Sequence, residues 1–260
     1  MLIIVILRPI FIVILRVIIT FATQSIALLS WGDIEPLASG FFYILIMQRV
    51  IFYIDGFNFY YGLRRAKYAD NKWLKAYWID VVKLCEQFLG EGQVLERVVY
   101  FTASPLNPDK SMRQSAFLNA NKAINGSRFE VVRGKYLKKE IICPYCQGHI
   151  SRPEEKRTDV NISVRMVGDA VLKKADIYAL VSADSDLLTP INYIKQNFKD
   201  TIVKVYFPPS NFSHDIRDAL SAWGKKPVLM IKSFYLFDRA HLTDVVESKG
   251  ERFICPDNWK

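Results

Sequence analysis

Cysteine is scarce in this 260-residue chain, which carries four thiols. They are Cys85, Cys143, Cys146 and Cys255. So few thiols exclude a fold stapled by disulfides, and they make a reducing cytosol the expected compartment. The chain also lacks internal repeats and low-complexity linkers. Its length and its ordinary balance of apolar and charged residues predict one well-cored domain with an appendage.

Negative charge is in deficit, and the formal net charge is +9. Residues 1–46 contribute nothing to this excess, because Arg8 and Arg16 cancel Asp33 and Glu35. A basic surface attracts phosphates while acids gathered at one place hold a cation, which suits a metal-dependent enzyme with a polyanionic substrate. Many soluble proteins are equally basic without binding nucleic acid, so the charge alone does not decide.

Residues 1–46 form an apolar extension that differs from the rest of the chain. The run 2–29 is interrupted mainly by Arg8, Pro9 and Arg16, and a second apolar run covers 41–46. The first run is long enough to cross a bilayer, but Arg16 would then lie within the membrane. A signal peptide fits poorly, because no charged region precedes the run and no small-residue cleavage site follows it.

Three interpretations of this extension stay open. It is a membrane anchor, or upstream sequence ahead of a natural start at Met47, or a buried core helix. The expected location is therefore the cytoplasm, with a membrane-anchored protein carrying a cytoplasmic domain as the alternative. A membrane is a partner only if residues 1–46 are genuinely translated.

The remainder alternates between buried strands and helices. Strands are predicted at residues 50–54, 95–102, 129–133, 176–182 and 202–207, and helices at 59–63, 79–89, 109–124, 158–173 and 187–198. In the helix over 158–173, Thr158 is the expected cap and Val160, Val164, Val167 and Val171 the expected buried face. This order predicts an α/β fold, a Rossmann-like, mostly parallel sheet sandwiched by helices.

Three domain boundaries follow from the same pattern. Residues 47–210 are the expected core domain, interrupted by a cysteine-containing inserted loop at 143–153. Residues 211–260 are an expected C-terminal extension packing on that domain, with a helix at 213–220, an apolar stretch at 228–231 and an irregular tail.

Four aspartates occupy the informative places in this pattern. Asp55 ends the first strand and Asp184 ends the fourth, while Asp159 stands in the first turn of a helix and Asp186 begins another. First and fourth strands can be neighbours at the switch point of a doubly wound sheet, where ligands bind. Several carboxylates meeting there need a cation, and oxygen ligands without His or Cys favour Mg²⁺ or Mn²⁺.

Each aspartate taken alone also has a structural interpretation. Asp186 suits a helix N-terminus, Asp55 suits a turn ahead of Gly56, and Asp159 is an ordinary first-turn acid. The constellation is more informative than its members.

Three ordered motifs resemble the NYN domain, in its LabA-like branch, within the PIN-like nuclease superfamily. They are the runs IDGFN at 54–58, EKRTDV at 155–160 and SADSDL at 182–187. The resemblance covers about residues 49–207 and implies a parallel sheet sandwiched by helices, with an acidic cluster that binds Mg²⁺ or Mn²⁺ and hydrolyses phosphodiester bonds, usually in RNA. It assigns Asp55, Asp159, Asp184 and Asp186 to the metal site, with Asn58 as a neighbour that orients a water or a phosphate.

Residues around these motifs are candidates for substrate contacts. Lys156 and Arg157 would meet a phosphate, although a solvated pair is the plainer interpretation of either alone, and Ser182 and Ser185 would add hydrogen bonds. The aromatic residues of this region either stack on unpaired bases or fill the core. They are Phe57, Phe59, Tyr60 and Tyr61.

The pair Cys143 and Cys146, with His149 close behind, has the spacing of half a structural zinc site. The missing ligands would come from Cys255, His214, His241 or a second chain, since a homo-oligomer is an open expectation. A reduced loop without metal is the alternative, and a thioredoxin-like role fits poorly because the pair lies in an inserted loop.

The sequence thus favours a metal-dependent nuclease and leaves three rivals. The first is a nucleic-acid-binding or regulatory module of the LabA-like type with little catalysis. The second is a phosphatase for small esters, which would want an acid two residues after Asp55, where Phe57 stands. The third is a membrane-tethered scaffold, which depends on residues 1–46.

Overall fold

Six parallel strands form the central sheet of the computed structural model, which describes residues 47–142, 144–248 and 250–260. The strands are β1 (Gln48–Asp55), β2 (Gln93–Thr102), β3 (Phe129–Arg133), β6 (Ile177–Val181), β7 (Ile202–Phe207) and β8 (Val228–Leu229). Residues Gln48–Lys260 form one compact unit around this sheet.

The strand order is β3-β2-β1-β6-β7-β8, and every neighbouring pair is parallel. The chain builds outward from β1 to β3 and then returns to place β6 on the other side of β1. The order therefore reverses between β1 and β6, which pair from Val50↔Ile177 to Ile54↔Val181. In such a sheet the ligand crevice lies beyond the carboxyl ends of the two strands at the reversal.

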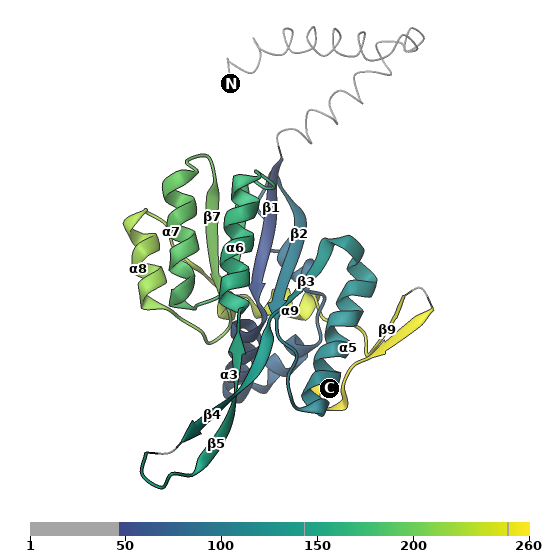
Figure 1. Cartoon of the computed structure of the whole chain (residues 1–260). Helices are drawn as coiled ribbons and strands as arrows, with labels where there is room; N and C mark the ends of the chain where they lie inside the picture. Colours follow the sequence, from purple (N-terminus) through teal and green to yellow (C-terminus); the bar gives the residue numbers. More distant parts are fainter. Residues whose placement is uncertain (1–46, 143, 249) are drawn as a thin grey trace, which may run out of the picture. The chain divides into compact units, whose positions relative to one another are not determined.

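Helices cover both faces of the sheet (Figure 1). One face carries α6 (Thr158–Val171), α7 (Leu188–Asn197) and α8 (His214–Ala222). The other carries α3 (Gly56–Ala69), α4 (Val81–Glu86), α5 (Pro108–Asn125) and α9 (Phe234–Arg239). Short 3₁₀ turns complete the connections: η1 (Asn71–Tyr77), η2 (Gly126–Arg128), η3 (Ser185–Leu187), η4 (Met230–Ser233) and η5 (Asp257–Trp259). The predicted α/β fold with helices on both faces is confirmed.

Alternating side chains of β1 pack into two separate hydrophobic cores, one on each face of the sheet. Phe52 and Ile54 pack with α3, α4 and α5, whereas Ile51 and Tyr53 pack with α6, α7 and α8. Successive residues of a strand point to opposite faces, so a strand buried on both sides reads as an unbroken apolar run. Asp55 follows Tyr53 by two residues and so faces the α6 side.

The inserted loop predicted at 143–153 is the end of a β-hairpin: residues 144–148 connect two strands, and 149–153 belong to the second strand. Strands β4 (Lys135–Ile142) and β5 (His149–Lys156) pair antiparallel, and Ile142 lies opposite His149. Only the connection between the two strands remains a loop. The sequence pattern missed these strands because a hairpin outside the main core needs no continuous apolar run.

The C-terminal tail predicted to be irregular has regular structure. It contains α9, the antiparallel pair β9 (Val245–Ser248) and β10 (Glu251–Ile254), and η5. Phe237, Val246, Cys255 and Trp259 are buried in the core on the α3 side. These elements are too short to show a period in the sequence, and contacts with the core stabilise them.

Helix α6 differs from its prediction at the cap and on the buried face. Arg157, in the left-handed conformation at φ 78°, is its N-cap, and Thr158 is its first helical residue. Ile162 and Met166 are fully buried against the sheet, while Val160, Val164 and Val171 are 63%, 68% and 56% exposed. Of the four valines predicted to be buried, Val167 alone packs against the core on this face. Both faces repeat with helical period, so periodicity could not choose between them.

The three interpretations of the apolar extension fall on residues 1–46, outside the described residues. Within residues 47–142, 144–248 and 250–260, no helix has the length and apolar character needed to cross a membrane.

Candidate metal centre

Asp55 closes β1 and opens α3. Its Oδ1 accepts a hydrogen bond of 2.9 Å from the backbone N–H of Asn58, so it caps the helix, and the residue is 4% exposed. Its Oδ2 accepts a 2.9 Å hydrogen bond from the hydroxyl of Ser182, just after β6. The strand, the helix start and the neighbouring strand therefore all fix the orientation of this carboxylate.

Gly56 allows α3 to begin this close to the sheet. A Cβ at this position would lie 2.6 Å from the carbonyl oxygen of Phe101 and 2.4 Å from a ring carbon of Tyr100. Backbone cannot yield as a flexible side chain does, so glycine is needed for the close approach of α3 to β2. The glycine after Asp55 thus serves packing at the site.

Asp184 is held from the opposite side of the reversal point. It caps η3, and its Oδ1 accepts a 3.1 Å hydrogen bond from the backbone N–H of Asp186. Its own N–H donates to the Ser182 hydroxyl oxygen at 3.1 Å. Ser182 is fully buried, and its single hydroxyl group is hydrogen-bonded to both Asp55 and Asp184.

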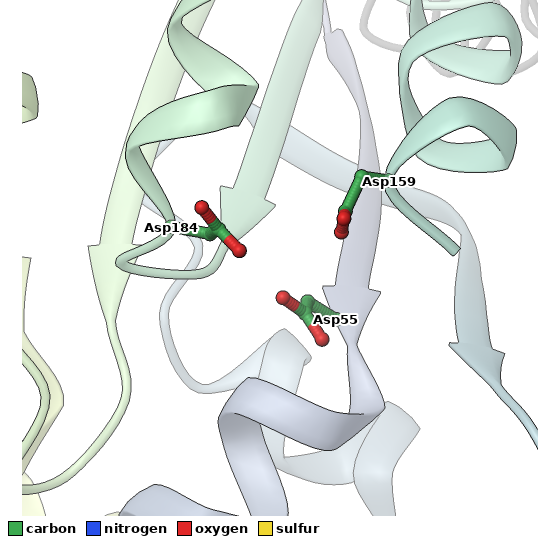
Figure 2. Close-up of side chains that lie close together, drawn as sticks. All are labelled: Asp55, Asp159 and Asp184. Carbon is green, nitrogen blue, oxygen red and sulfur yellow. The ribbon is translucent and has the colours of Figure 1, made fainter. Parts of the chain in front are cut away.

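Asp159 completes the group from the first turn of α6. Figure 2 shows the side chains of Asp55, Asp159 and Asp184 directed toward a common space, and ligand atoms of all three lie within 4.8 Å of one another. Burial, and then the negative charges of Asp184 and Asp186, raise the pKa of the Asp159 carboxyl. Like charges this close oppose ionisation, and a bound cation would remove that opposition.

The donor set fits a hard divalent cation. All three side chains offer carboxylate oxygens, and the cluster contains no His or Cys. Oxygen-only ligands suit Mg²⁺ and Mn²⁺, whereas zinc sites usually include nitrogen or sulfur. A divalent cation can therefore be held by Asp55, Asp159 and Asp184.

Asn58 and Asn211 connect the loops around the cluster. The Asn58 side-chain oxygen accepts hydrogen bonds from the backbone N–H of Ala183 at 3.2 Å and from the Asn211 amide at 2.5 Å. Asn211 also donates to the Asn58 carbonyl at 2.8 Å and accepts a hydrogen bond from Arg65. Asn58 thus positions the segment that carries Asp184. Sequence reasoning missed Asn211, because it lies 153 positions from its partner.

The remaining predicted site residues lie around this centre. Asp186 stays outside the group of three but is close enough for its charge to act on Asp159. Arg157 precedes Asp159 and is exposed, and Ser185 is exposed in η3. Lys156 is the last residue of β5, and its side chain is outside the described part of the chain.

The predicted zinc half-site lies partly outside the described residues. Cys143 is not described, nor is the His149 side chain, while Cys146 is a free, exposed thiol. Cys255 is buried in the core on the α3 side, where burial raises its pKa to about 11. Among the residues described, the aspartate cluster is the group suited to a metal ion.

Fold and site together define a class: a doubly wound parallel sheet with an acidic cluster suited to a divalent cation at its switch point. The NYN domain family matches residues 49–222, more than half of the chain. The chain belongs to the NYN domain family, as its motifs predicted, whereas its LabA-like branch stays a prediction.

Two further similarities accompany the family match. The chain is 25% identical to 6-hydroxy-3-succinoylpyridine 3-monooxygenase HspA of Pseudomonas putida, in an alignment covering 72% of this chain and 75% of that protein. A protein of unknown function from Vibrio parahaemolyticus has a crystal structure similar at a TM-score of 0.45 and 18% identity, over 66% of this chain and 89% of that one.

Proposed function

We propose that this protein is a metal-dependent nuclease that hydrolyses phosphodiester bonds in RNA. The observation that carries the proposal is the meeting of Asp55, Asp159 and Asp184 within 4.8 Å at the switch point of an NYN domain. The net charge of +9 supports it, because a basic surface attracts a polyanion toward an acidic centre that would otherwise repel it.

In this proposal Asp55, Asp159 and Asp184 hold Mg²⁺ or Mn²⁺, with Asp186 as a further acid beside them. When bound, such an ion supplies Lewis acidity and lowers the pKa of a coordinated water. Ser182 and Asn58 fix the two loops that carry the carboxylates, which keeps the site organised before substrate arrives. Arg157, with Lys156 and Ser185, provides the contacts to the phosphate groups.

The test is cleavage of an end-labelled single-stranded RNA by the full chain in Mg²⁺, Mn²⁺ or EDTA. Asp184→Asn and Asp159→Asn each lose at least about 100-fold in rate, because they remove a metal ligand, and EDTA stops the wild type. The matched control is Asp200→Asn, an exposed aspartate in the turn before β7, at the opposite edge of the sheet. It cleaves like the wild type.

The outcomes separate nuclease from binding module. If the wild type binds RNA but cuts no faster than Asp184→Asn in either metal, the protein is a regulatory nucleic-acid-binding module, and the nuclease proposal is wrong. Equal cutting by all variants would indicate a contaminating nuclease. A DNA strand of the same sequence, run in parallel, tests the choice of RNA.

A further inference from the structure

A cavity of about 290 Å³ lies at the same edge of the sheet as the acidic cluster. Its walls come from the first turns of α3, from η1, from the segment after β2 and from α5. Gly56, the residue directly after Asp55, lines it, and so does Tyr100. The Tyr100 ring lies against Gly56, where an added Cβ would be 2.4 Å from a ring carbon, and burial and then the charge of Asp55 raise the pKa of Tyr100.

The lining has the chemistry of a site for a flat anionic ligand. Of its twenty residues, eight are aromatic, three are cationic and none is acidic. The cationic residues are Arg64, Lys110 and Arg113. Aromatic faces bind planar rings, and cations beside them select a ring that carries a negative group, as a nucleotide does.

Three tyrosines of the lining are only half-buried. Tyr60 lies with its ring centroid 5.4 Å from that of Tyr61 and 5.6 Å from that of Tyr77, and all three side chains are half-buried. Leu63 and Phe117, by contrast, are buried residues of the lining. An aromatic side chain that only fills the core would be as buried as that of Phe117.

The hydroxyls of Tyr60 and Tyr77 are available to a ligand. Neither makes a hydrogen bond with any residue in the part of the chain that the structure describes. Burial raises the pKa of both, to about 12 for Tyr77, so each stays protonated at neutral pH and can donate to a base edge. The positive charges of Arg64 and Arg113 act on the pKa of Tyr60 in the opposite sense, and the Arg64 guanidinium carbon lies 5.8 Å from the centroid of the neighbouring Tyr61 ring.

We propose that this cavity binds one unstacked nucleobase of the strand whose phosphate lies at the acidic cluster, while Arg64, Lys110 and Arg113 contact the neighbouring phosphates. This inference rests on the proposed nuclease function. Tyr60 is five residues after Asp55, about 7.5 Å along the axis of α3. Gly56, next to Asp55, and Tyr60 both line the cavity, so a base near the cut bond can reach it.

The test is binding, measured apart from cleavage. The full chain, in EDTA so that no metal-dependent cutting occurs, is titrated into a fluorescent 2′-O-methyl RNA octamer, and anisotropy gives Kd. Tyr60→Leu, which keeps bulk but removes the flat ring, weakens binding by about 5- to 150-fold. Arg113→Gln, at the rim, weakens it at low salt and flattens the salt dependence.

Tyr193→Ala is the matched control, because Tyr193 is 48% exposed on α7, on the other face of the sheet. It binds as the wild type does. Ribose 5-phosphate fails to displace the octamer at concentrations where a nucleoside monophosphate does, since it lacks the base. Thermal unfolding of each variant confirms that it is folded.

The results distinguish this inference from the proposed function. If Tyr60→Leu and Arg113→Gln bind like the wild type while the wild type still cuts RNA, the cavity is not a base site and the nuclease proposal stands. Base-dependent binding through Tyr60 in a protein that cuts no RNA supports the cavity and removes the nuclease. Binding of pyridine-3-carboxylate without any nucleotide would overturn the inference in favour of a small aromatic acid.

Discussion

Two groups of acidic side chains, built from the same strand and the same helix, have opposite electrostatic environments. The first group is the metal-site cluster, with Asp55 from β1 and Asp159 from α6. The second surrounds Asp169 of α6, which is bonded to Tyr53 of β1. Asp159 and Asp169 are ten residues apart, about 15 Å along the helix axis. The comparison isolates what makes an acidic group a binding site.

Asp169 is neutralised within the protein. Its side chain is 2% exposed and accepts hydrogen bonds from Tyr53 at 2.9 Å and Arg165 at 2.8 Å, with Lys174 at 3.0 Å. Burial alone would raise its pKa, but these donors outweigh burial and hold the pKa below its usual value. Arg165 also forms a two-bond pair with Glu130 at 2.7 and 2.8 Å.

Asp159, at the other end of the helix, faces acids instead of cations. No lysine or arginine of the described residues forms an ion pair with Asp159 or Asp184. Its pKa is raised, whereas that of Asp169 is lowered. Asp159 and Asp184 are therefore suited to a cation from solution, while the buried Asp169 has its cations built in.

The largest expected effect is the loss of stability when Asp169, the neutralised acid of α6, is replaced. Asp169→Asn leaves Arg165 and Lys174 facing a buried position without their negative partner, so the free energy of unfolding falls by about 3 kcal/mol. Urea unfolding at pH 7 measures it. A loss below about 1 kcal/mol would mean that Asp169 is as dispensable to the fold as the cluster acids, and the contrast would fail.

The second expected effect is stabilisation of the fold by a metal ion bound at the cluster of Asp55, Asp159 and Asp184. Mg²⁺ or Mn²⁺ at 100 times its Kd raises the free energy of unfolding of the wild type by about 2.7 kcal/mol, because the ion binds the folded chain alone. Asp184→Asn removes a ligand and loses this gain, whereas the Asp200→Asn control keeps it. Equal stabilisation of Asp184→Asn would place the ion elsewhere.

The smallest expected effect is on the pH dependence of stability without metal. The pKa of Asp159 is raised by folding, so its charge destabilises the fold above that pKa, and this cost fades as pH falls through it. Asp159→Asn is therefore slightly more stable than the wild type at pH 7 in EDTA, and the two converge below about pH 4.

Asp169 gives the opposite sign. Its folded-state pKa is lowered, so its contribution is complete above the unfolded pKa near 3.9 and is lost as pH falls through the folded value. Comparing thermal unfolding of Asp159→Asn and Asp169→Asn between pH 7 and pH 3 tests both signs. The same pH trend in both variants would refute the comparison.

Much of the fold could be predicted because its core strands are buried on both faces. The strand predicted at 50–54 lies within β1 and the one predicted at 176–182 contains β6, and both of these runs are buried. Where the pattern had no such run, it failed: the hairpin β4–β5 and the tail with α9, β9 and β10 contribute short, half-exposed elements. The exposed valines of α6 show a third limit, since period alone does not say which face meets the sheet.

The sequence by itself determined the positions of the acidic residues: Asp55 after one buried strand, Asp184 after another, and Asp159 at a helix start. Only the tertiary structure decided that they meet, because β1 and β6 are distant in the sequence but pair in the sheet. The hydrogen bond between Ser182 and Asp55 joins residues that are 127 positions apart. It likewise decided that Asp169 is buried and bonded to Tyr53 of β1, whereas its partner Arg165 stands one turn earlier on the same helix. Local sequence sets which charge a residue can carry, and the packing of distant segments sets what that charge faces.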